Sequence, residues 1–110
     1  MLGLLMLPTL CMAVETAALD SLKAQADKAF AQEKYEQAAE IYTRIADSVT
    51  SVSVCYNLGC TYYRLDSMAQ SVLWFERALK LNPADENIEC NLRLAREKTI
   101  DRITAKHSFV

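Results

Sequence analysis

Glycine, proline and histidine are scarce in this sequence of 110 residues, with two, two and one copies. So little glycine and proline argues against a turn-rich sandwich or barrel, and against a collagen-like or Pro/Gly-rich disordered chain. A single histidine excludes most metal and catalytic sites that need two. The net charge of −2 also lacks the basic excess of a nucleic-acid-binding protein. Apolar residues are abundant, at 52% of the sequence. Alanine is frequent, and together with leucine and glutamate it favours an all-α fold.

Charge is missing altogether from residues 1–14. The apolar stretch 2–10 is long enough for the core of a signal peptide and shorter than the roughly 20 residues of a membrane-spanning helix. We therefore expect a helix break at Pro8, a signal-peptide-like segment at residues 1–13 that is cleaved after Ala13, and an exported protein. Because no Lys or Arg precedes the apolar stretch, the alternative is a structural N-terminal helix in a cytoplasmic protein.

The rest of the chain repeats itself at an interval of 33 residues. Residues 35–42 align with residues 68–75, and the same offset relates Arg44 to Arg77. A period of this length indicates a repeated helical hairpin, and two-residue breaks make the helices within each hairpin antiparallel. We expect Ser67 to cap the fourth helix. Apolar residues at helical spacing predict helices near 17–32, 35–47, 52–65, 68–80 and 84–104.

The second repeat carries a set of residues in a fixed order: Leu58, Gly59, Tyr62, Ser71, Phe75, Ala78 and Pro83. This order resembles the tetratricopeptide family, whose pattern is W-x2-L-G-x2-Y, then A-x3-F and a late proline. Cys55 and Ser71 stand where the tryptophan and the first alanine are usual. In the first repeat, Ala26, Ala38 and Tyr42 occupy matching positions. These residues are expected to pack the repeats, with small side chains where paired helices approach closely and aromatic rings beside them.

The resemblance implies an all-α, solenoid-like fold of two helical hairpins and a capping helix. In the last helix, Arg93 and Arg96 replace the glycine and tyrosine of the pattern, and its other face is apolar, as a terminal cap requires. Two repeats are fewer than the usual three or more, so this helix or self-association must complete the core. The expected parts are a signal-like segment at 1–13, hairpins at 14–50 and 51–83, a capping helix at 84–104 and a tail at 105–110.

Several further runs look like the tetratricopeptide family of the Bat aerotolerance operon: residues 56–59, 62–65, 76–79, 81–83 and 95–99. That family has a signal peptide before its repeats and usually continues into transmembrane helices and an SH3-like domain. The resemblance covers its front part and implies a scaffold in the periplasm or at the membrane. Membrane contact is expected only if an anchor lies beyond this chain.

In the family that the chain resembles, the first helix of each hairpin lines a concave groove that holds a peptide. The matching positions predict a groove lined by Lys23, Phe30, Ser53, Tyr56, Cys60, Tyr63, Arg64 and Asn91. We expect Tyr56, Tyr63 and Arg64 to carry the contacts, because tyrosine combines apolar area with a hydroxyl. The alternative is that the two tyrosines pack locally. Asp27 stands where a carboxylate-binding clamp needs asparagine, so we expect a partly apolar peptide or helix rather than an acidic tail.

These patterns predict a non-enzymatic scaffold for protein–protein interaction, with no cofactor, metal or nucleic-acid partner. Cys55 and Cys60 face about 140° apart on one helix, so they cannot pair with each other. The alternative function is a thiol-redox or metal-binding accessory protein that uses Cys60 and Cys90, although no ligand pair has the CxxC spacing of a zinc site. Catalysis is disfavoured because no serine, cysteine or carboxylate has a base nearby in the sequence.

Overall fold

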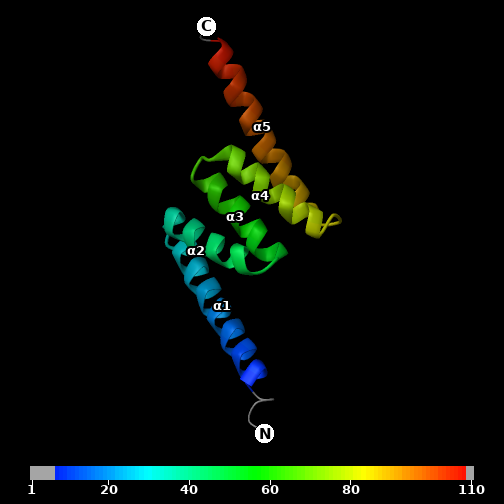
Figure 1. Cartoon of the computed structure of the whole chain (residues 1–110). Helices are drawn as coiled ribbons and strands as arrows, with labels where there is room; N and C mark the ends of the chain where they lie inside the picture. Colours follow the sequence, from blue (N-terminus) through cyan, green and yellow to red (C-terminus); the bar gives the residue numbers. More distant parts are fainter. Residues whose placement is uncertain (1–6, 109–110) are drawn as a thin grey trace.

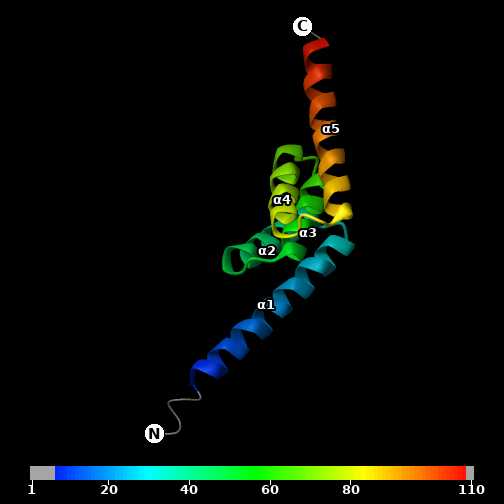
Figure 2. The ribbon, with the colours of Figure 1, turned by 90° about the vertical axis from the view of Figure 1, so that its right-hand side faces the viewer.

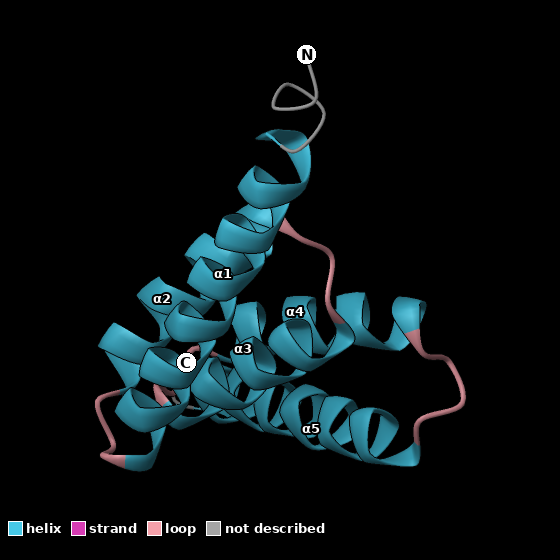
Figure 3. Cartoon of the chain, turned by 90° about the horizontal axis from the view of Figure 1, so that it is seen from below, coloured by secondary structure: helices cyan, strands magenta, loops and turns pink. Residues whose placement is uncertain are grey.

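The computed structural model describes residues 7–108, with side chains described for residues 15–106, and this range is helical without strands (Figures 1 and 3). Each helix packs against the next one along the chain. The result is two helical hairpins followed by one long helix, which confirms the predicted all-α, solenoid-like fold. The helices are α1 (Leu7–Ala31), α2 (Tyr35–Ser48), α3 (Val52–Arg64), α4 (Met68–Leu81) and α5 (Glu86–Ser108).

The two hairpins turn through the same backbone motif. In the first, the N–H groups of Glu33 and Lys34 donate to the carbonyls of Phe30 and Ala29. In the second, residues 66 and 67 make the same two bonds to residues 63 and 62, 33 positions further on. This pair of bonds is the Schellman helix ending, which places one residue in the left-handed region. That residue is Glu33 (φ 62°) in the first hairpin and Asp66 (φ 64°) in the second, where glycine is the usual choice.

Replacing Glu33 with glycine should raise the free energy of unfolding by about 1 kcal/mol, since a left-handed backbone costs a side-chain-bearing residue on the order of 1–2 kcal/mol. Glu33 is exposed, so the change removes no core contact. Chemical denaturation measures the gain. Lys34→Gly is the matched control, because Lys34 has a negative φ of −89° and glycine brings no relief there. Equal effects of the two changes would show that the turn is not strained.

The second hairpin closes around a very short approach between α3 and α4. A Cβ atom added to Gly59 would lie 2.5 Å from the ring of Phe75, so only glycine fits at this position. Beside it, the Ser71 hydroxyl donates to the Gly59 carbonyl at 2.8 Å in a fully buried site. Leu58 and Ala78 are also fully buried. The small residues therefore do what the repeat pattern predicts: they let the two helices touch while Phe75 fills the space alongside.

The first hairpin and the start of the second share a continuous apolar core. Ala26 from α1 and Ala38 from α2 are fully buried, and Tyr42 is 2% exposed. Leu58 of α3 belongs to the same cluster, so the repeats are joined through the core rather than only through the chain. Tyr62 is half-buried and packs against this cluster. Stacking of this kind is how repeat proteins bury the apolar face that no single hairpin can cover.

Several helix ends differ from the sequence-based prediction. Helix α1 begins ten residues early, at Leu7, and Pro8 lies in its first turn, where proline needs no hydrogen-bonding N–H, instead of breaking the helix. Ser67 occupies the N-cap of α4 without a side-chain capping bond, whereas Ser51 accepts such a bond from the Val54 N–H at 3.3 Å. Pro83 is exposed: it ends α4 but does not pack between the repeats.

Helix α5 covers the second hairpin with its first half only. Asp85 caps it, accepting from the N–H groups of residues 87 and 88 at 2.9 and 3.1 Å, so it begins later than predicted. Ile88, Leu92 and Ala95 are buried against the hairpin, whereas Ile100 and Ile103 are 61% and 54% exposed. The prediction that the apolar face of the last helix acts as a cap is therefore wrong for the second half of α5, because α5 is longer than the helices beneath it.

Basic residues of α5 fasten it to the turn between α3 and α4. Arg102 pairs with the Asp66 carboxylate and donates to the Asp66 carbonyl at 3.1 Å, and Lys98 lies 3.6 Å from the same carboxylate. The hydrogen bond from Arg102 and the two positive charges hold the pKa of Asp66 below its usual value. Near the middle of α5, Arg96 pairs with Glu76 of α4 at 2.8 Å. Arg96, one of the two residues that depart from the repeat pattern in the last helix, therefore holds α5 against α4.

The outer ends of α1 and α5 extend away from the hairpins in opposite directions (Figures 1 and 2). The described chain is accordingly elongated, with extents of 74 × 30 × 21 Å. Among the described residues, no helix is both long enough and apolar enough to span a membrane. Residues 1–6 of the predicted signal-like segment lie outside the described range.

Candidate partner-binding groove

A concave groove opens between α1, α3 and α5, the first helices of the successive units. Its main hollow has a volume of about 280 Å³ and continues into a second hollow of about 250 Å³ beside α2. Phe30, Tyr56 and Cys60 line both, so the two form one surface. The main hollow is lined by Phe30, Tyr56, Cys60, Tyr63, Arg64, Phe75, Asn91 and Leu94.

This set contains six of the eight residues predicted from the sequence to line the groove. Ser53 and Lys23 line neither hollow. Ser53 is exposed near the start of α3, and Lys23 turns aside to pair with Asp27 at 3.0 Å. The hollow is also lined by Leu94, one turn beyond Asn91 on α5, and by Phe75, which was expected only to pack the hairpin.

Tyr56 is a wall of the groove rather than a free contact residue. Its hydroxyl accepts a hydrogen bond from the Asn91 side chain at 2.8 Å, which ties α3 to α5. Its ring lies 5.8 Å from the ring of Phe75. Burial raises the pKa of Tyr56, and the neighbouring Cys60 raises it further. The alternative of local packing is therefore the better description of this tyrosine.

Tyr63, Arg64 and Leu94 leave more of the surface open. The Lys98 ammonium lies 4.7 Å from the centre of the Tyr63 ring, which places a positive charge on one face of that tyrosine. Arg64 is exposed, and its guanidinium forms no ion pair within the described part of the chain. Leu94 is 43% exposed although it is aliphatic. These three side chains offer apolar area and a planar set of donors to a bound molecule.

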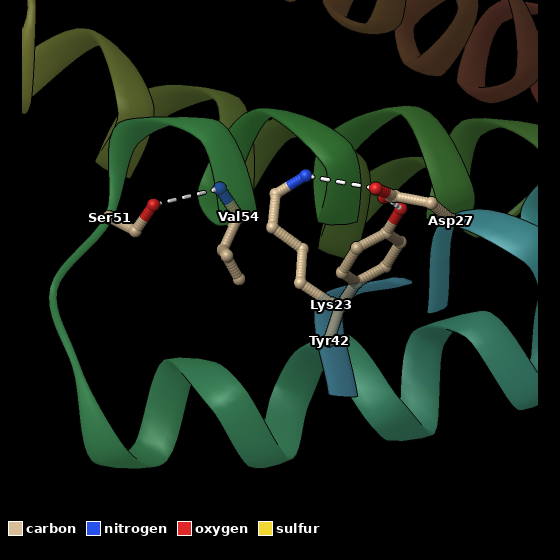
Figure 4. A network of polar contacts seen from close by, with 5 residues as sticks. All are labelled: Lys23, Asp27, Tyr42, Ser51 and Val54. Carbon is tan, nitrogen blue, oxygen red and sulfur yellow. Dashed lines mark hydrogen bonds and ion pairs between the residues drawn. The ribbon is translucent and has the colours of Figure 1, made fainter. Parts of the chain in front are cut away.

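Asp27 closes the α1 end of the groove through a polar network (Figure 4). The Tyr42 hydroxyl donates to one carboxylate oxygen, and Lys23 donates to the other at 3.0 Å. Partial burial raises the pKa of Asp27, but the two hydrogen bonds outweigh it and hold this pKa below its usual value. Burial, together with the Asp27 carboxylate, strongly raises the pKa of Tyr42. Asp27 is therefore ionised at neutral pH, and an acidic tail meets a negative charge here.

The cysteines have separate environments. Cys55, Cys60 and Cys90 are free thiols that are buried, half-buried and exposed respectively. Burial raises the pKa of the Cys60 thiol, which the Tyr56 hydroxyl and Arg64 lower by less. Cys90 instead lies on the outer surface of α5, 3.8 Å from the Arg93 guanidinium. Within the described residues, no group of three or more His, Cys, Asp or Glu side chains could hold a metal ion.

The geometry of stacked hairpins with a groove on their first helices agrees with comparisons to known proteins. Residues 52–85 match the model of the tetratricopeptide repeat. The tetratricopeptide match covers the hairpin of α3 and α4 and the turn into α5. Proteins built from such repeats are in general non-catalytic scaffolds for protein–protein interaction, with a concave surface that binds the partner. No curated protein matches the chain.

A solved tetratricopeptide domain has a similar arrangement of helices. The crystal structure of the Sgt2 TPR domain from Aspergillus fumigatus superimposes with a TM-score of 0.70 at 22% sequence identity. The match covers 84% of this chain and 62% of that chain, so the chain spans less than two thirds of the domain it resembles. At this identity the likeness shows the fold, which includes α1 and α5 as well as the matched repeat.

Proposed function

We propose that this chain is a non-enzymatic scaffold that holds a partly apolar peptide of a partner protein in the groove between α1, α3 and α5. One observation carries the proposal: side chains from three successive first helices, Phe30, Tyr63 and Leu94 among them, line a single continuous hollow. The two parts of the groove, about 280 and 250 Å³, suit a few side chains of a peptide rather than a whole domain. The charge of Asp27 at one end disfavours an acidic ligand.

Tyr63 and Leu94 are the residues with which to test this groove, because neither is fully buried. A photo-activated cross-linker at position 94 should capture the partner, and the binding peptide can then be mapped. The double change Tyr63→Ala and Leu94→Ala should weaken binding of that peptide by about 2 kcal/mol or more, roughly thirtyfold, if both residues are central contacts. Isothermal titration calorimetry measures the loss, and circular dichroism should remain unchanged.

Leu73 provides a matched control. It is also 43% exposed, but it lies on α4 and lines neither hollow of the groove. A cross-linker at position 73 should capture no partner, and Leu73→Ala should leave the affinity unchanged. Equal losses from Leu73→Ala and from the groove variant would contradict the proposal, as would unaltered binding by a folded groove variant.

We also propose that the protein acts outside the cytoplasm, in the periplasm or at the membrane, as the resemblance to the Bat-operon family implies. The uncharged residues 1–14 support export. A cut after Ala13 falls inside α1 and spares Leu19, Leu22 and Ala26, which pack against α2 and the repeat core. Cells that express the full sequence should therefore release a chain shorter by about 13 residues. Mass spectrometry checks this, and an N-terminus at Met1 in all of the purified protein would contradict export.

A further inference from the structure

A second hollow lies between the end of α2 and α4, and it shares no lining residue with the groove. Its volume is about 320 Å³, at the small end of ligand pockets, which are roughly 300–1,000 Å³. Its apolar surface comes from Val49, Cys55, Trp74 and Leu81. We call it the Trp74 pocket. It is large enough for one or two side chains of a partner, not for a helix.

Two positive side chains and one negative side chain line the rim of the Trp74 pocket, which leaves an excess of positive charge there. The Arg77 guanidinium lies 4.5 Å from the centre of the Trp74 ring, which holds it over the pocket. Lys80 lies one turn further along α4. In the described part of the chain, neither cation forms an ion pair. Asp47 also lines the pocket, yet it pairs with neither of them.

We propose that the Trp74 pocket binds a short segment of a partner protein in which a leucine is flanked by aspartates. The leucine side chain lies on the indole between Val49 and Leu81, and a neighbouring carboxylate accepts from Arg77 and Lys80. A guanidinium already stacked on a ring loses little freedom when it forms a two-pronged bond to a carboxylate. The site lies on the second helices of the hairpins, so it is available while the groove is occupied.

The repeat arithmetic shows why this pocket occurs once within the two hairpins. At an offset of 33 residues, Arg77 corresponds to Arg44, but Trp74 corresponds to Ile41 and Lys80 to Asp47. The first repeat thus has the arginine without the aromatic ring beneath it and without the second cation. Arg44 is exposed and does not line the Trp74 pocket, which makes it a matched control.

The probe is the blocked peptide acetyl-Asp-Leu-Asp-amide, compared with the same peptide carrying asparagine in place of aspartate. Trp74 is the only tryptophan of the chain, so its fluorescence reports directly on this pocket. The aspartate peptide should change Trp74 emission and bind at least tenfold more tightly than the asparagine peptide. The double change Arg77→Gln and Lys80→Gln should abolish that preference, whereas Arg44→Gln should retain it.

The proposal is overturned if the aspartate peptide leaves Trp74 emission unchanged up to about 1 mM, the weak end of specific recognition. It is also overturned if the wild-type protein binds both peptides equally, or if Arg44→Gln and the double variant lose the preference alike. The groove variant Tyr63→Ala with Leu94→Ala should bind the aspartate peptide normally. Loss of binding in that variant would place the peptide in the groove and would also overturn the proposal.

Discussion

Replacing Gly59 with leucine should destabilise the protein more than any other single substitution on α3. A Cβ atom alone meets three ring atoms of Phe75 at 2.5 to 2.8 Å, distances at which the ring or a helix must shift. Phe75 is 1% exposed, so its ring can shift only toward the groove hollow that it lines, and a whole leucine side chain also forces α3 and α4 apart. Overpacking costs about 1–3 kcal/mol and sometimes more, and we expect a loss above 3 kcal/mol in the free energy of unfolding.

Two further variants separate overpacking from a general effect of leucine on α3. Ser53→Leu adds the same side chain at an exposed position of the same helix and should change stability by no more than about 0.5 kcal/mol. Phe75→Leu added to Gly59→Ala should recover part of the loss, because the smaller side chain vacates the ring position. Thermal melting measures all of these. A melting temperature of Gly59→Leu equal to that of the wild type would show that the two helices do not meet at Gly59.

The hairpins were predictable because their packing depends on the types of single residues at fixed intervals in the sequence. Gly59, Ser71 and Ala78 are small because a larger side chain at any of these positions would collide with the paired helix. The same 33-residue interval gave the breaks between helices. Apart from the start of α1, the helix bounds within the hairpins therefore agree with the prediction to within one residue.

The details of the surfaces were not predictable, because they depend on pairs of residues far apart in the sequence. Nothing local marks Asn91 as the partner of the Tyr56 hydroxyl, 35 residues away. The approach of the Arg77 guanidinium to the Trp74 ring depends on the rotamers of both side chains, and the pocket also needs Val49, which follows the end of α2. The left-handed turn residues were not predictable from local sequence either. Glu33 and Asp66 occupy positions where glycine, the usual residue, would have indicated such a turn.

The groove contains features that the sequence predicts and features that only tertiary contacts determine. The positions matched to the tetratricopeptide pattern, together with the helical period, place Phe30, Tyr63 and Arg64 along one hollow. Spacing could not show that Lys23 would turn toward Asp27, since that choice depends on the Tyr42 hydroxyl arriving from α2. Periodicity therefore predicts which face a residue occupies, and tertiary contacts decide which side chains remain available for binding.

The stability of the two repeats should depend on α5, and the double change Ile88→Ala with Leu92→Ala tests this. Ile88 packs in the cluster with Cys55 and Ala78, whereas Leu92 packs in the cluster with Phe75. The two residues are one helical turn apart and both clusters pack against Tyr56 and Leu79, so the two losses are coupled rather than strictly additive. Each large-to-small change in a core costs about 2–5 kcal/mol, so together they approach the whole stability of a small domain, about 5–15 kcal/mol.

We expect this double variant to melt well below the roughly 45–65 °C that is typical of mesophilic domains. Helical circular dichroism should be lost from both hairpins rather than from α5 alone. The control is Ile100→Ala with Ile103→Ala, which removes similar side chains from the same helix where they are 61% and 54% exposed. This control should melt within a few degrees of the wild type, since exposed aliphatic groups contribute little to the core. If the first double variant lost only the helicity of α5, the hairpins would be stable without their cap. If the control instead melted as early as the core variant, the second half of α5 would be packed against a second copy of the chain, and concentration-dependent melting would reveal that association.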